Sequence, residues 1–174
     1  PQNGQRIAQM NPAAFGPVWF VKAIKYVADG REEMKALDST NLRDTAVVQT
    51  KFKASIGNEP VADSTSFIRL IENKNDYILY ESSAAANQYA VFSEVYYPRG
   101  WKAFIDGKEV PIVKTNYALR GLPVPAGKHK IELKFEPRSY ELGNSITMYA
   151  SLLAFLLLFG SLFMEWRSSR KTQV

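Results

Sequence analysis

The sequence contains no cysteine and only one histidine, His129, among its 174 residues. Without cysteine the chain has no disulfide, no zinc–thiolate site and no thiol nucleophile. A single histidine removes most histidine-based metal sites and disfavours a serine–histidine relay. His129 begins an apolar alternating stretch, so we expect it to be a half-exposed packing residue of a strand.

Motifs that bind phosphate or metal ions are also missing. The sequence has no glycine-rich phosphate loop, no HExxH pair and no calcium-loop spacing, so it predicts no catalytic residue, no cofactor and no metal site. The excess of positive charge is also small. Residues 1–141 carry 19 Lys and Arg against 16 Asp and Glu. A nucleic-acid-binding surface requires a dense basic patch, and no nucleic-acid partner is expected.

The sequence does contain one long stretch without charge. Residues 142–164 read LGNSITMYASLLAFLLLFGSLFM, and a membrane-spanning helix of about 20 residues fits at residues 146–166. Leu and Phe occur on all sides of it, unlike the stripe of a surface helix, although a buried core helix is the alternative. The hydroxyls of Thr147 and Ser161 are expected to bond back to their own helix. Three basic residues follow, so the positive-inside tendency predicts a cytoplasmic tail at residues 167–174.

Most of the remaining sequence predicts β structure. Short apolar strands separated by turn residues follow one another from residue 65, which is typical of an antiparallel β-sandwich or jelly-roll-like domain. In the last of them, Ile131 and Leu133 alternate with charged residues, so one face of that strand packs on a core. The expected strands are residues 46–52, 66–72, 77–83, 89–97, 101–105, 108–114, 117–124 and 129–135.

A short N-terminal helix precedes this series. An apolar run at residues 17–28 predicts a strand, and Asp29 followed three residues later by Glu32 is the capping-box signature of a helix start. Met34 and Leu37 then fall on one face of the helix. The fold class predicted is therefore mainly β, with a short N-terminal helix and one C-terminal transmembrane helix.

Residues 95–111, VYYPRGWKAFIDGKEVP, place aromatic side chains beside a hairpin signal. The Asp-Gly pair at residues 106–107 favours a type I′ turn, in which both central residues have positive φ. With this pair as the loop, most apolar side chains of the hairpin, including Trp101, fall on one face, and Phe104 falls on the other. Asp106 is expected to be a turn residue.

The aromatic residues of this stretch have two possible roles. Trp101 is either a core residue of the hairpin or a ring on which a sugar stacks. Tyr96 and Tyr97 are either ordinary strand residues or part of a glycan platform. The candidate glycan contacts are Trp101, Phe104, Tyr96 and Tyr97.

The order of the motifs resembles the C-terminal end of the YfhO family of bacterial multi-span membrane proteins. The motifs are FSEVYYPRGWKAFIDGKEVPI, then TNYALRGLPVPAGKHKIELKFEP, then a terminal hydrophobic helix. Because the chain begins with Pro1, we expect a fragment of a longer protein. The resemblance implies a parent similar to GT-C glycosyltransferases, which use lipid-phosphate-linked sugars outside the cytoplasmic membrane. The family's expected catalytic acids lie in an early extracytoplasmic loop, so the resemblance assigns no catalytic residue here.

On this interpretation the chain is an accessory part of a membrane protein. We expect residues 1–64 to be a strand–helix–strand segment that packs on a β-sandwich of residues 65–137, with residues 138–145 as a linker. The β domain would be extracytoplasmic and non-catalytic, with an acceptor-positioning or structural role. Expected partners are the lipid bilayer, the other transmembrane helices of the parent, and a cell-envelope glycan or lipid-linked sugar. The alternative is a membrane-anchored carbohydrate-binding module.

Overall fold

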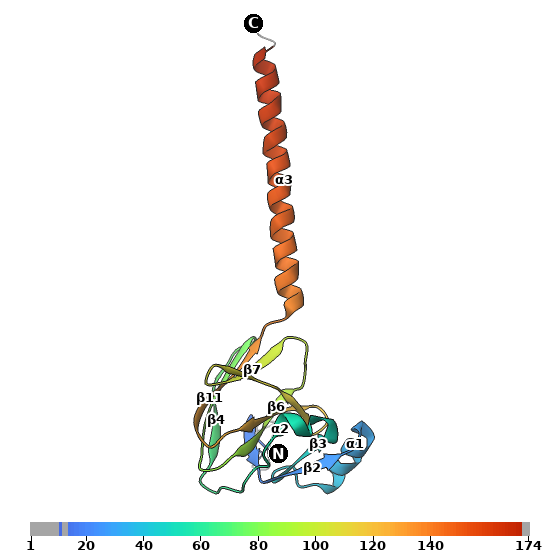
Figure 1. The fold of residues 1–174 in the computed structure, drawn as a ribbon, viewed down its shortest axis with the longest axis vertical. Helices are drawn as coiled ribbons and strands as arrows, with labels where there is room; N and C mark the ends of the chain where they lie inside the picture. The colour runs from blue at the N-terminus through green and yellow to red at the C-terminus, as the bar shows by residue number, and fades with distance from the viewer. Residues whose placement is uncertain (1–10, 12–13, 172–174) are drawn as a thin grey trace, which may run out of the picture. The chain divides into compact units, whose positions relative to one another are not determined.

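The computed structural model describes residue 11 and residues 14–171. The chain divides into a β unit, which ends at Phe135, and a helical unit, which begins at Glu136 (Figure 1).

One sheet of the β unit has six strands and is closed by a continuous stretch of chain. Two strands at its opposite edges, β1 (Val18–Val21) and β2 (Ala23–Val27), are separated only by Lys22. The two edges therefore adjoin, and the sheet curls into a barrel-like layer. The order is β1-β6-β10-β9-β3-β2, where the others are β3 (Thr45–Gln49), β6 (Gln88–Val95), β9 (Val113–Thr115) and β10 (Leu119–Val124).

The second sheet has five strands, and all its pairs are antiparallel. Its order is β4-β5-β11-β7-β8, with β4 (Phe67–Asn73), β5 (Tyr77–Ala84), β7 (Trp101–Ile105), β8 (Lys108–Val110) and β11 (Gly127–Phe135). The prediction of a mainly β, sandwich-like fold is confirmed. One pair, β2 with β3, is parallel, which the hairpin pattern of the sequence does not indicate.

Side chains alternate between the two faces of each strand, and the buried apolar ones gather in two main clusters. Ile131 and Leu133 of β11 are fully buried, as their spacing predicts. Strand β6 is buried on both faces from Gln88 to Phe92, because alternate side chains enter different clusters. The first cluster contains Val18, Ile78, Tyr80, Ala90, Phe92, Ala103, Ile105, Leu122, Val124, Ile131 and Leu133. The second, on the other side of β6, contains Val21, Ala46, Val48, Ile56, Tyr89, Val91 and Val113.

The predicted strand at residues 108–114 is wrong, because it is two strands in different sheets. Strand β8 ends at Val110 and pairs with β7, whereas β9 begins at Val113 and pairs with β10. Pro111 lies between them and has no N–H for a ladder hydrogen bond. The chain therefore crosses from the five-stranded to the six-stranded sheet at this proline.

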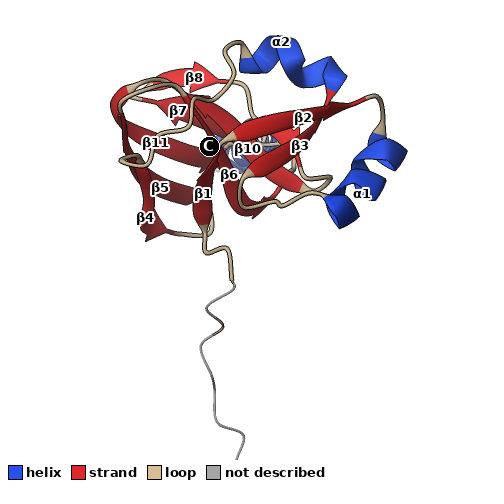
Figure 2. Cartoon of the chain, turned by 90° about the horizontal axis from the view of Figure 1, so that it is seen from below, coloured by secondary structure: helices blue, strands red, loops and turns tan. Residues whose placement is uncertain are grey.

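Helix α1 (Gly30–Ser39) begins where the sequence predicts. The Asp29 side chain accepts hydrogen bonds from the backbone N–H groups of Arg31 and Glu32. The helix lies beside β2 and β3, away from β4 and β5 (Figure 2). The predicted apolar face is wrong at Met34, which is exposed. The buried positions are Glu33 and Ala36, so a charged residue occupies the face that packs on the sheet.

The strand predicted at residues 46–52 is shorter than expected. Strand β3 ends at Gln49, and a 3₁₀ turn at Thr50–Phe52 leads into the short helix α2 (Lys53–Ile56). The Thr50 hydroxyl donates to the carbonyl of Val27 at 3.0 Å, which joins this turn to the end of β2. Ile56 of α2 is buried in the second apolar cluster.

The helical unit is one helix, α3 (Arg138–Lys171), so the segment expected as a linker at residues 138–145 is helical. Residues Leu142–Met164 contain an 18-residue window with a mean hydropathy of 2.1, and the segment is long and apolar enough to cross a membrane. Thr147 and Ser161 donate to backbone carbonyls of their own helix at 2.9 and 2.8 Å. This confirms that their hydroxyls are satisfied within the helix. Residues 172–174 of the predicted tail lie outside the described residues.

Candidate functional site

The Asp-Gly turn forms the hairpin that the sequence predicts. Asp106 and Gly107 have φ values of 50° and 82°, as a type I′ turn requires. The predicted register is confirmed, because Ile105 pairs with Lys108 and Phe104 pairs with Glu109. The β7–β8 hairpin is therefore held in a defined geometry, with its tip beside the start of β11.

Asp106 is more than a turn residue. Its Oδ2 lies 2.6 Å from Nδ1 of His129, and its Oδ1 accepts the backbone N–H of Lys130 at 2.8 Å. The other ring nitrogen of His129 lies 3.2 Å from the carbonyl oxygen of Ala126. Both ring nitrogens face acceptors, so an imidazolium that donates from both satisfies the site best. The prediction that His129 is a simple packing residue misses this ion pair.

The Asp106–His129 pair changes the proton affinity of both side chains. The hydrogen bond to Asp106 raises the pKa of His129 above its usual 6.5, despite partial burial. The bond from His129, followed by the one from the Lys130 backbone, lowers the pKa of Asp106 below 3.8. The pair thus favours the charged form of both groups and connects the hairpin tip to β11.

A cavity of about 570 Å³ opens beside this pair. Its volume falls within the range of roughly 300–1,000 Å³ that small-molecule sites occupy. The walls come from the β7–β8 hairpin, the end of β10, the start of β11 and the loop after α2. The side chains that line it are Ile56, Asn58, Asn87, Gln88, Ile105, Asp106, Lys108, Val110, Pro123, Val124, Pro125 and His129.

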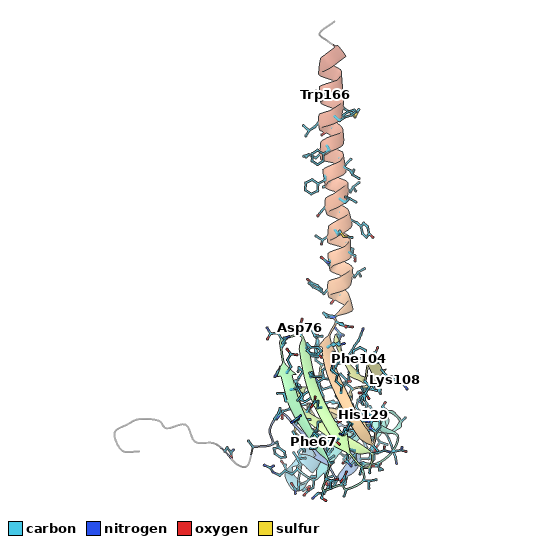
Figure 3. All side chains as sticks on the ribbon, turned by 90° about the vertical axis from the view of Figure 1, so that its left-hand side faces the viewer. Phe67, Asp76, Phe104, Lys108, His129 and Trp166 are labelled. Atoms are coloured by element: carbon cyan, nitrogen blue, oxygen red, sulfur yellow. The ribbon has the colours of Figure 1, made fainter. Side chains whose placement is uncertain are left out.

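Three of the four predicted glycan contacts gather at a different and smaller hollow. Tyr96, Tyr97 and Trp101 line a space of about 140 Å³. Tyr97 is half exposed, so its ring is accessible from solvent. Phe104 lies on the other face of β7, as the register predicts, and its ring is 5.0 Å from the Lys134 ammonium (Figure 3). Phe104 therefore does not line the hollow that the other three candidates share.

Trp101 is held from the core side by a buried arginine. The ring packs against the first apolar cluster, and the guanidinium carbon of Arg120 lies 4.1 Å from its centroid. Arg120 is only 3% exposed, and its Nε donates to the carbonyl of Val95 at 2.9 Å. One face of the indole is thus occupied within the protein, which supports the packing role of Trp101.

Metal binding finds no support in the part of the chain that the structure describes. Within residue 11 and residues 14–171, no three His, Cys, Asp or Glu side chains lie close enough together to hold an ion. The acidic and imidazole groups at the larger cavity are the paired Asp106 and His129. The larger cavity therefore provides hydrogen-bonding groups beside an apolar wall.

The Asp106–His129 pair predicts how stability depends on pH. Because the pKa of His129 is raised on folding, its contribution is complete below pH 6.5 and is lost as the pH rises through the folded value. The lowered pKa of Asp106 gives a contribution that is present above pH 3.8 and is lost on further acidification. We expect unfolding experiments on the whole chain to show the pair's full contribution, about 1 kcal/mol, between these two pH values.

The variants His129→Gln and Asp106→Asn should both remove the fall in stability that begins above pH 6.5. Asparagine tolerates positive φ, so Asp106→Asn keeps the turn while it removes the charge. The matched control is Asp76→Asn, an exposed turn residue, which should leave the profile unchanged. If wild-type stability does not fall in this range, the ion pair does not form in solution.

The comparison with known families agrees with the membrane helix and the β unit. Residues 41–147, more than half of the chain, match the model of the family described as bacterial membrane protein YfhO. No curated protein and no solved structure matches the chain. The match extends from the segment before β3 through β11 and into α3, which contains the candidate membrane span. The chain therefore belongs to the YfhO family of bacterial membrane proteins.

Proposed function

We propose that the β unit is the non-catalytic, extracytoplasmic domain of a longer YfhO protein and that α3 contains its last membrane span. The observations that carry the proposal are the family match at residues 41–147, which ends within the first part of α3, and the apolar run Leu142–Met164. In this proposal, residues 65–137 are the β domain to which residues 1–64 add a packing segment. The span occupies residues 146–166.

The groups with acid–base character support a structural rather than a catalytic role. Asp106 uses its two oxygens on His129 and on the backbone of Lys130. These hydrogen bonds hold the hairpin tip against β11, and they occupy both oxygens of the carboxylate. The bond-making step, lipid-linked glycosyl transfer in our proposal, then belongs to the other parts of the parent protein.

The β unit would assist this reaction by positioning the acceptor or by covering the membrane-embedded part. Tyr96, Tyr97 and Trp101 line one hollow, and aromatic rings provide large apolar faces with polar tips. We propose these three residues as the contact with a cell-envelope glycan or lipid-linked sugar. The other transmembrane helices of the parent are the proposed neighbours of α3.

The charges that flank the span support the side of the membrane that we propose. Arg167, Arg170 and Lys171 come directly after it in the sequence, and basic residues near a span favour the cytoplasm. Fusions to Val174 of the parent protein test this orientation. A fluorescent protein should be bright there and alkaline phosphatase inactive.

A second pair of fusions, on the other side of the proposed span, serves as the control for the orientation. The same reporters inserted in the exposed Asp76 turn between β4 and β5 should give the opposite result, with active phosphatase. Phosphatase activity at Val174 combined with inactivity at the turn would reverse the orientation and remove the proposed role outside the cytoplasm.

A further inference from the structure

The larger cavity, beside the Asp106–His129 pair, combines an apolar wall with hydrogen-bond donors. Ile105 and Val124 of the first cluster continue into this wall. Pro123 of β10 and Pro125, directly after that strand, extend it. Prolines have no backbone N–H, so this side of the cavity offers carbon surface with few donors. Such a wall suits the apolar face of a sugar ring or a similarly flat aliphatic ligand.

The opposite side carries donors that the β unit itself leaves unused. The Lys108 ammonium and the Asn58 amide have no partner among the described residues. The Asn87 side chain accepts from the backbone N–H of Ala126 at 3.2 Å through its oxygen, which leaves its NH₂ group available. The Lys108 ammonium and the amide nitrogens of Asn58 and Asn87 are thus available donors, and they favour a ligand that carries acceptors.

The charge at the cavity adds a second constraint. Asp106 and His129 compensate each other across 2.6 Å, so among the described lining residues Lys108 supplies the uncompensated charge. Figure 3 shows Lys108 beyond the end of β7 and His129 near the start of β11, on the same side of the β unit. One positive charge beside neutral amides matches a ligand with a single negative charge.

We propose that this cavity binds a saccharide unit that bears one carboxylate, with the carboxylate at Lys108 and the ring against the wall of Ile105, Val124 and the two prolines. The site is separate from the aromatic hollow of Tyr96, Tyr97 and Trp101 and goes beyond the role proposed above. It depends neither on the orientation in the membrane nor on glycosyl transfer by the parent, so its failure would leave both of those standing.

Titration of the whole chain in detergent micelles with a matched pair of sugars tests the proposal. Galacturonate and its methyl ester have the same ring and differ by one charge. Isothermal titration should show that the acid binds at least tenfold more tightly than the ester. This preference should fall steeply with added salt, because a partly exposed charge pair is screened.

Variants locate the contact. Lys108→Gln should abolish the preference for the acid, and Lys108→Arg should retain it, since the charge is kept. Lys25→Gln, at an exposed lysine of β2 away from the cavity, is the matched control and should bind like the wild type. If Lys108→Gln unfolds, as thermal melting would reveal, Asn58→Ala provides a second lining position, and it should weaken binding of both sugars.

Several outcomes would overturn the proposal. These are no binding of the acid at millimolar concentration, equal affinity for acid and ester, or an acid preference that survives Lys108→Gln. Galactose 1-phosphate serves as a third probe. If it binds more tightly than galacturonate, the cavity recognises phosphate and the assignment to a carboxylate is wrong.

Discussion

Replacing Gly121 by alanine is expected to destabilise the β unit by about 3 kcal/mol. Gly121 lies in β10, where a Cβ atom would come within 2.3 Å of the hydroxyl oxygens of Tyr89 and Thr115. These two hydroxyls are buried and share a hydrogen bond of 2.7 Å. An added methyl group must therefore displace a buried aromatic ring and break that bond.

The measurement is urea unfolding of the whole chain in detergent, followed by near-ultraviolet circular dichroism. Gly30→Ala is the matched control, because a Cβ atom there meets its nearest neighbours at an ordinary 3.7 and 3.8 Å. Since alanine is the better helix former, this control should be neutral or slightly stabilising. Equal stability of Gly121→Ala and the wild type would show that β10 does not approach Tyr89 this closely.

Replacing Glu33 by alanine is the second change with a large expected effect, again about 3 kcal/mol. Glu33 is fully buried, and its carboxylate oxygens accept from the Gln49 amide at 2.7 Å and from the backbone N–H of Tyr117 at 2.8 Å. Both Tyr117 and its neighbour Asn116 have positive φ. The carboxylate thus joins helix α1 to the end of β3 and to the β9–β10 turn.

Removal of this side chain leaves the buried Gln49 amide and the partly buried N–H of Tyr117 without acceptors. A buried donor without an acceptor costs more than the hydrogen bond itself contributes. Glu33→Gln keeps an acceptor for the N–H of Tyr117, so it should lose less than half as much stability as Glu33→Ala. Glu32→Ala, in the same helix at an exposed position, should cost about 1 kcal/mol or less through the capping bond to Ala28. If Glu33→Ala costs no more than Glu32→Ala, the buried network does not form.

Some elements of the fold follow from local pattern. Strand β7 has the predicted bounds, and β11 starts two residues before the predicted strand and ends with it, because alternation of apolar and charged residues specifies which face is buried. Asp29 begins α1 because a side-chain acceptor is needed at a helix start. The Asp-Gly turn sets the register of β7 and β8 because a two-residue type I′ turn matches the twist of the flanking strands.

Other elements depend on partners distant in the sequence. The closure of the six-stranded sheet at Lys22 and the parallel pairing of β2 with β3 leave no local signature. Glu33 occupies a position that a helical pattern assigns to an apolar residue, and it is tolerated there because two donors from other elements meet it. No sequence spacing between Glu33 and Tyr117 indicates this contact.

In the candidate sites, too, some features follow from local sequence and others depend on contacts between distant residues. The sequence alone determines that an aromatic-rich hairpin precedes a long uncharged stretch, that Phe104 faces away from Trp101, and that Asp106 lies in a tight turn, because these features depend on residues a few positions apart. The tertiary structure decides that Asp106 meets His129, that Arg120 covers Trp101, and that Lys108 and Asn58 share a cavity. These contacts join strands and loops from different parts of the chain, and they exist because burial of the two apolar clusters brings those elements together.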